Sequence, residues 1–255
     1  MTNTNENLPR SRGRFLRAIP GLVMALGLAF AAAPAQARET PAQTESAGFA
    51  ELRRALDGFF VILAIDPASG EMLKVRSEPG GVEIIRPLVY LDVEAAYADW
   101  ISGTVPQSHA VVAANGIDVI IETQGTAVWM VGDFDASKAQ VAIDQPALFY
   151  VATADDQPVL QTFSDGQRLP MFVSYNDAAH LLDKAKQSMT GLELKIEQSD
   201  MMGTLQAIIT GEVIGVRLVA PGSNLRWAQE NQRGVRTLDG YVTEADLAMQ
   251  ALTGE

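Results

Sequence analysis

The most constraining feature of this chain is a segment that occurs twice, at positions 83 residues apart. From Pro87 the sequence reads P-L-V-Y-L-D-V-E-A-A, and from Pro170 it reads P-M-F-V-S-Y-N-D-A-A. The same offset relates Met130–Gly132 to Val213–Gly215. A repeat of this length is typical of one supersecondary unit used twice. The sequence therefore predicts an internal duplication that produces two structurally similar halves.

Residues 1–37 have the pattern of a secretory signal peptide. Four arginines between Arg10 and Arg17 precede an apolar run from Ala18 to Ala33, and A-Q-A at 35–37 fits a small-x-small cleavage site. The run is shorter than the ~20 apolar residues of a membrane span, although an uncleaved anchor stays open as an alternative. The arginines are not adjacent and no cysteine is present. We therefore expect Sec-type export to a periplasm and no integral membrane segment after cleavage.

The charge of the chain narrows the class of its partners. The net charge is −12, and residues 1–37 hold four Arg and one Glu, so the chain without them would carry −15. Such an acidic chain disfavours nucleic acid and anionic lipid headgroups as ligands. The absence of cysteine excludes disulfides, thiolate metal sites and cysteine nucleophiles. A hydrophobic content of 47% indicates that an apolar core supplies the stability.

The distribution of apolar residues divides the chain after residue 37 into four parts. Residues 38–58 are a leader with a short helix, residues 59–146 and 147–221 are the two halves, and residues 222–255 are a polar C-terminal tail with a helix. Each half should contain three strands, a long helix, a short helix and a closing strand. The expected strands are 59–65, 71–75, 82–91 and 127–131, then 147–153, 159–163, 169–174 and 213–219, and the expected short helices are 116–122 and 201–209.

The helices are expected from their capping residues and from apolar spacing. Asp92 and Asn176 should cap the long helices of the two halves, and Thr243 with Asp246 resembles a capping box for the last helix. Hairpins mixed with flanking helices predict an α+β fold with mainly antiparallel sheets. One helical stripe is expected to face the core: Val93, Ala96, Tyr97, Trp100 and Ile101.

No catalytic or metal-binding signature is present in the sequence. The two histidines, His109 and His180, are 71 residues apart, with nothing acidic beside either. The segment from Asp133 to Asp144 imitates the oxygen spacing of a calcium loop, but Lys138 stands where the sharp turn needs Gly. We interpret this segment as an acidic linker between the halves. We therefore expect no catalytic residues, no metal and no cofactor, and a protein that is not an enzyme.

The repeated pattern resembles a known family. It consists of an opening strand, an Asp-containing turn, a short strand and a proline-led strand that runs into D/N-x-[E/D]-A-A. It is present as F-F-V-I-L-A-I-D-P-A-S-G with R-P-L-V-Y-L-D-V-E-A-A, and as L-F-Y-V-A-T-A-D-D-Q-P with L-P-M-F-V-S-Y-N-D-A-A. Over residues 58–220 this resembles the Tic22-like family, a chloroplast import translocon subunit and its bacterial periplasmic relatives. The secretion-associated SseB-like domains share the strand-to-helix step and remain an alternative.

The resemblance implies two similar α+β halves set side by side, no enzymatic activity, and a role in chaperoning or handing over proteins in transit between two membranes. Four aromatic residues then become candidates for a client-binding surface: Tyr90, Trp100, Trp129 and Phe172. They either form plain core or line an exposed apolar groove for extended client segments.

Two functions follow from these alternatives. The first is a non-enzymatic periplasmic chaperone-like or protein-transport factor that binds exported polypeptides, outer-membrane proteins among them. The second is a periplasmic small-molecule-binding protein or hydrolase with a pocket between the two halves. The sequence leaves the clients and the oligomeric state open.

Overall fold

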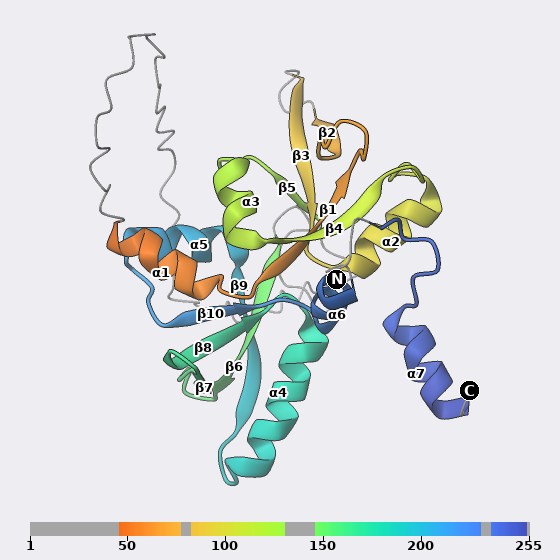
Figure 1. Ribbon diagram of the computed structural model, residues 1–255. Helices are drawn as coiled ribbons and strands as arrows, with labels where there is room; N and C mark the ends of the chain where they lie inside the picture. Colours follow the sequence, from red (N-terminus) through yellow and green to blue (C-terminus); the bar gives the residue numbers. More distant parts are fainter. Residues whose placement is uncertain (1–45, 78–82, 131–145, 231–235, 254–255) are drawn as a thin grey trace, which may run out of the picture. The chain divides into compact units, whose positions relative to one another are not determined.

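The fold was determined from a computed structural model that describes residues 46–77, 83–130, 146–230 and 236–253. The expected signal peptide and the expected linker from Asp133 to Asp144 lie outside the described residues. The described residues contain two five-stranded sheets, one from each half of the chain. Figure 1 shows the arrangement of their strands.

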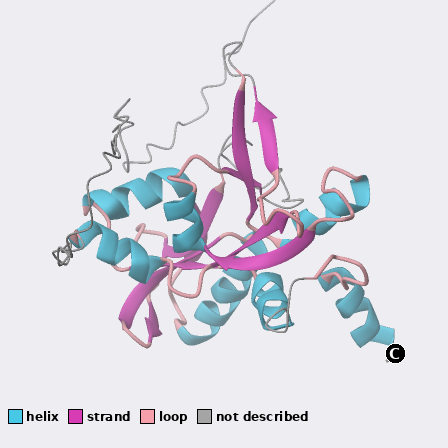
Figure 2. Cartoon of the chain, turned by 45° about the horizontal axis from the view of Figure 1, so that its top comes forward, coloured by secondary structure: helices cyan, strands magenta, loops and turns pink. Residues whose placement is uncertain are grey.

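The first sheet and its helices come from residues 47–130. The first of these helices is short, as expected from the spacing of Phe49, Leu52 and Leu56. The elements are α1 (Ala47–Ala55), β1 (Phe60–Ile65), β2 (Lys74–Ser77), β3 (Ile84–Tyr90), α2 (Val93–Ser102), β4 (Ala110–Asn115), α3 (Gly116–Glu122) and β5 (Val128–Met130). The β2–β3 hairpin extends away from the rest of its sheet (Figure 2).

The second half repeats this order of elements, and two further helices follow it. The elements are β6 (Ala147–Thr153), β7 (Gln161–Phe163), β8 (Gly166–Phe172), α4 (Tyr175–Ser188), β9 (Leu194–Asp200), α5 (Met201–Thr210), β10 (Val216–Val219), α6 (Gly222–Glu230) and α7 (Glu244–Thr253). The expected strand 147–153 and the expected helix 116–122 are confirmed with their bounds. The short second strand of each half begins two to three residues later than expected.

The two sheets have the same topology. The first has the order β2-β3-β1-β4 with β5 also on β3, and the second has β10-β8-β6-β9 with β7 also on β8. In each, the closing strand is parallel to the proline-containing strand, and the other pairs are antiparallel. The prediction of an α+β fold with two similar, mainly antiparallel halves is thus confirmed.

The predicted offset of 83 residues between the two halves is wrong by one residue at the repeated segment. Helix α2 has Asp92 as its N-cap and helix α4 has Ser174, 82 positions later. The strands agree, because Tyr90 pairs with β1 where Phe172 pairs with β6. Pro87 therefore corresponds to Leu169 and not to Pro170. A shift of one residue would move every strand side chain to the other face of its sheet. The burial pattern of the strands therefore excludes the alignment that the identical residues suggest.

The expected cap Asn176 is also wrong. It is an exposed residue in the first turn of α4, and the Ser174 hydroxyl accepts the Asp177 N–H at 3.3 Å instead. We expect Ser174→Ala to lower the free energy of unfolding by about 1 kcal/mol, because it removes the cap. Asn176→Ala, the matched control, should change it by less than about 0.5 kcal/mol. Urea denaturation of both variants measures the difference, and equal effects would contradict this assignment.

Alternate residues of each sheet face different cores. Val61 and Leu63 of β1 join a central core shared by both halves, whereas Ile62 and Ala64 face an outer core under α2 and α6. The side chains of the second sheet also alternate between two cores, with Leu148 in the central core and Phe149 in an outer core under α4. The period of two expected for strands therefore places one shared core between two separate ones.

The C-terminal region contains a helix that the sequence analysis treated as polar tail. Helix α6 buries Asn224 and Trp227 against the first half. The capping box of α7 is confirmed, since Thr243 Oγ1 and Asp246 Oδ2 are 2.7 Å apart. One residue of the expected core stripe is wrong: Ile101 is 61% exposed at the end of α2.

Candidate binding groove

A groove of about 510 Å³ lies between the two halves. Helices α1, α3 and α5 form its walls, and Trp129 of β5 also lines it. The lining residues are Phe49, Leu52, Ile120, Ile121, Gln124, Gly125, Trp129, Met202, Leu205, Gln206 and Ile209.

Equivalent short helices of the two halves line the groove. Asn115 caps α3 and Asp200 caps α5, 85 positions later, so the two short helices correspond. Two lining residues of α3 and one in the turn after it have counterparts that are lining residues of α5: Ile120, Ile121 and Gln124 correspond to Leu205, Gln206 and Ile209. Helix α1 completes the groove on one side.

Among the described residues, the lining has no charged side chain, although 20% of the residues in the chain are charged. Gln124 and Gln206 are its polar side chains apart from the indole N–H of Trp129. Such a surface gives no compensation for a charge taken out of water, so it discriminates against charged ligands. Apolar surface that enters the groove gains about 25 cal/mol per Å².

The groove has a buried floor and an exposed rim. Leu52, Leu205 and Trp129 are buried, whereas Ile121 and Ile209 are 46% and 41% exposed. Large apolar side chains that remain exposed around a buried apolar floor are typical of an interaction site. The Nε1–H of Trp129 is buried and has no hydrogen-bond partner within the described residues. A ligand carbonyl that reached this nitrogen would satisfy it.

Polar contacts fix α1 against the second half. Glu51 accepts hydrogen bonds from Arg168 at 2.8 Å and from the Gly215 N–H at 2.9 Å. Burial raises the pKa of Glu51, but the Gly215 N–H and the Arg168 guanidinium together lower it below the ordinary value of a glutamate. Arg217 adds an ion pair to Asp57 at 2.8 Å. These contacts hold the helix that carries Phe49 and Leu52 in place.

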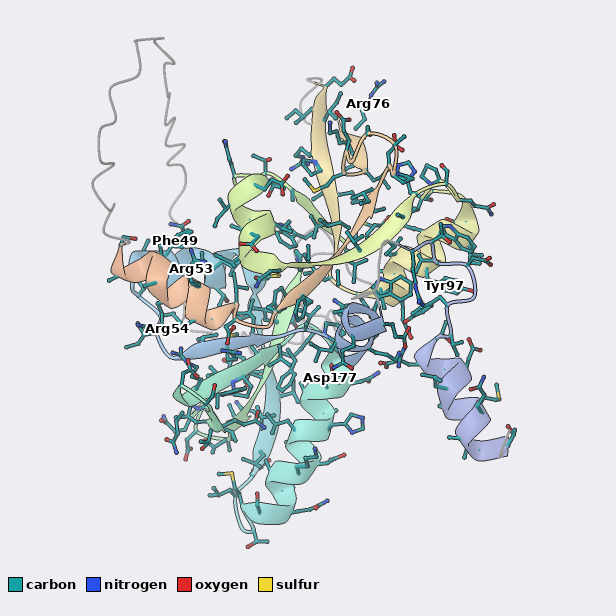
Figure 3. All side chains as sticks on the ribbon, viewed as in Figure 1. Phe49, Arg53, Arg54, Arg76, Tyr97 and Asp177 are labelled. Atoms are coloured by element: carbon teal, nitrogen blue, oxygen red, sulfur yellow. The ribbon has the colours of Figure 1, made fainter. Side chains whose placement is uncertain are left out.

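Arginines lie beside the groove on α1 and not in it. Figure 3 shows Phe49, Arg53 and Arg54 along this helix. The Arg53 guanidinium carbon is 5.7 Å from the centroid of the Phe49 ring, a cation–π distance. Arg54 pairs with Glu51 at 3.2 Å. The lining itself stays uncharged.

The four aromatic candidates lie in three different places. Tyr90 is fully buried in the first outer core, where its hydroxyl donates to Asp99 at 2.8 Å and burial, then Asp99, raises its pKa. Trp100 packs against the same core and is partly buried. Phe172 is buried under α4, and Trp129 lines the groove. The structure thus does not bring the four together on one surface.

The groove residues on α1, α3 and α5 were missed in the sequence analysis. The signal that points to them is the composition of the two short helices, G-I-D-V-I-I-E and M-M-G-T-L-Q-A-I-I-T, which are apolar on more than one side. A surface helix with apolar residues beyond one stripe has a second face to cover.

The other candidates from the sequence form no site. His180 is exposed on α4 and His109 is partly buried before β4. Asp66 is a turn residue that accepts the Ala68 N–H and the Ser69 hydroxyl, both at 2.9 Å. In the part of the chain that the structure describes, no three His, Cys, Asp or Glu side chains are grouped to hold a metal ion. The same part has no helix long and apolar enough to span a membrane.

The protein is therefore a duplicated α+β fold with an uncharged apolar groove between its halves. This is the fold of Tic22. A solved structure of Anabaena Tic22, titled as protein transport, superposes with a TM-score of 0.53 at 18% identity and covers 71% of this chain and 96% of its own. Tic22 from Plasmodium falciparum gives 0.47 at 10% identity, over 70% and 96%. No protein-family model and no curated protein sequence matches the chain.

Proposed function

We propose that this protein is a non-enzymatic transport factor with chaperone-like activity, and that it binds apolar segments of exported polypeptides in the groove between its halves. The observation that carries the proposal is that the described lining of that groove is uncharged, in a chain of net charge −12. The fold shared with Anabaena Tic22, which is described as a protein of protein transport, supports the same class of function.

The acidic surface and the apolar groove have complementary roles. The groove covers apolar side chains of a client, and each fully covered Leu or Phe contributes about 1.5–3 kcal/mol. The net charge of −12 on the chain as a whole keeps the complex soluble and disfavours self-association of client-loaded molecules. The lining residues that the structure describes include no titratable side chain, which favours binding over acid–base chemistry in the groove.

The compartment belongs to the same proposal. A Sec-type signal peptide at residues 1–37 would deliver the chain to a periplasm, with Arg38 as the first residue of the exported form. Unfolded outer-membrane proteins, which cross that space, present the uncharged apolar segments that the groove favours. N-terminal sequencing of the exported protein distinguishes cleavage at this site from retention of Met1.

The test places a charge on the rim of the groove. Ile121→Asp adds a carboxylate beside the bound segment, and we expect the affinity for an apolar client peptide to fall about tenfold or more, because a charge must lose water without gaining a partner. Ile121 is 46% exposed, so the free protein should stay folded. Fluorescence anisotropy of a labelled peptide from an outer-membrane protein gives the affinity.

The matched control is Ile101→Asp. Ile101 is also an exposed helical isoleucine, but it is not among the residues that line the groove. It should bind the peptide like the parent protein. Equal loss of affinity in both variants, or none in either while circular dichroism shows folded proteins, would contradict client binding in this groove.

A further inference from the structure

The outer edge of the first sheet is paired within the chain. Strand β4 lies at that edge, and the Val111 N–H donates to the Arg236 carbonyl at 2.7 Å, in an antiparallel bridge. Arg236, beyond α6, and the Trp227 indole N–H, which donates to the Val111 carbonyl at 3.3 Å, thus cover the outward backbone groups of Val111. An edge strand left open is a template for pairing with another chain, and here the first half closes it.

The corresponding edge of the second sheet is β9. Since Asn115 corresponds to Asp200, Val111 corresponds to Ile196. The Ala154 N–H donates to Glu193 and the Met201 N–H donates to Pro146, so the odd-numbered residues of β9 turn their backbone groups toward β6. Ile196 therefore turns its N–H and C=O outward. Neither group has a partner within the described residues.

The side chains next to Ile196 have opposite charges. Lys195 and Glu197 lie on the same face of β9, where they pair with each other at 2.7 Å, and their side chains are 40% and 35% exposed. Lys195 also pairs with Asp156 at 2.6 Å. An antiparallel pairing of two β9 strands centred on Ile196 would place Lys195 of each strand opposite Glu197 of the other. Opposite charges directly across a strand pair stabilise it, so β9 is complementary to itself in this register.

We propose that β9 is a dimerisation edge, and that a second copy of this chain adds its β9 antiparallel, with Ile196 facing Ile196. The two N–H and two C=O groups of this residue form the central pair of hydrogen bonds. The contact is isologous, as in most soluble dimers, because each copy contributes the same strand. It joins the second sheets of two molecules into one continuous sheet, and it is independent of the apolar groove.

A charge swap tests the register. Lys195→Glu and Glu197→Lys each place like charges opposite one another twice in the dimer, so each variant alone should dimerise about tenfold or more weakly than the parent. Mixing the two variants restores opposite charges at both positions, and the mixture should form heterodimers with the affinity of the parent. Sedimentation velocity of the purified full chain over a concentration series measures all three. Misfolding cannot produce this restoration.

A second variant tests the edge itself. Ile196→Pro removes the outward N–H without removing a hydrogen bond to β6, and proline is tolerated at such edge positions. It should sediment as a folded monomer, whereas Ile196→Val should behave like the parent. A monomeric parent protein at every concentration, or dimers unaffected by either charge change, would overturn the proposal. Crosslinking of a client peptide to β9 of a monomer would assign the edge to clients instead. None of these results depends on binding in the groove.

Discussion

Replacing Asn224 with Ala is expected to lower the free energy of unfolding by about 3–5 kcal/mol. Asn224 is fully buried, and its amide makes three hydrogen bonds of 2.8–2.9 Å, from the Val93 N–H and to the carbonyls of Phe60 and Leu91. Removing the side chain leaves three buried backbone groups without a partner, and each costs about 1–3 kcal/mol. Helix α6 would lose its main polar attachment to the first half.

Ser223→Ala is the matched control for this prediction. Ser223 is the preceding residue, it is also buried, and its hydroxyl donates one hydrogen bond to Asp92 at 2.9 Å. It should cost about 1 kcal/mol, the net worth of one hydrogen bond. Urea titration of both variants, read by far-UV circular dichroism, gives the two values. An Asn224→Ala variant no less stable than Ser223→Ala would show that α6 is not held by this amide.

Asn224 also shows why the sequence analysis missed α6. A polar segment after the second half is typical of an exposed tail, because Asn, Gln and Arg are mostly exposed residues. Nothing local indicates that a buried amide will reach backbone groups more than 130 residues away, at Val93 and Leu91. The strands were predicted more accurately, since alternation and β-branched runs such as 147–153 are local signals.

The candidate site was harder to predict than the fold for the same reason. The groove exists because α1, α3 and α5, far apart in the sequence, meet beside Trp129. Three of the four aromatic candidates pack elsewhere, in line with the large apolar area that aromatic side chains bury. The sequence analysis had placed a pocket between the two halves only under its alternative function, and the groove lies in that region. The predicted offset was wrong by one residue because the identity of Pro87 and Pro170 carries less information than the burial pattern around them.

The substitution Gly48→Ala is expected to destabilise the protein by about 3 kcal/mol and to distort the groove. A Cβ on Gly48 of α1 would lie 1.9 Å from the carbonyl oxygen of Ile209 in α5. Backbone atoms cannot rotate away as a side chain can, so the two helices must separate. Overpacking of this kind costs about 1–3 kcal/mol or more. Alanine is nevertheless the better helix former, by about 1 kcal/mol, so the sign of the effect is informative.

Gly222→Ala provides the control with the opposite expected sign. Gly222 begins α6, and a Cβ there would meet only a Glu244 side-chain oxygen, at 3.9 Å. It should leave stability unchanged or raise it by up to about 1 kcal/mol. Thermal unfolding of both variants measures stability, and anisotropy with the apolar client peptide measures the groove. Because α1 and α5 pack on each other and both line the groove, Gly48→Ala should weaken peptide binding even at temperatures where the variant is fully folded. A Gly48→Ala protein that is stabilised like Gly222→Ala and binds the peptide normally would mean that α1 does not seat on α5 as described, and the groove would lose one of its walls.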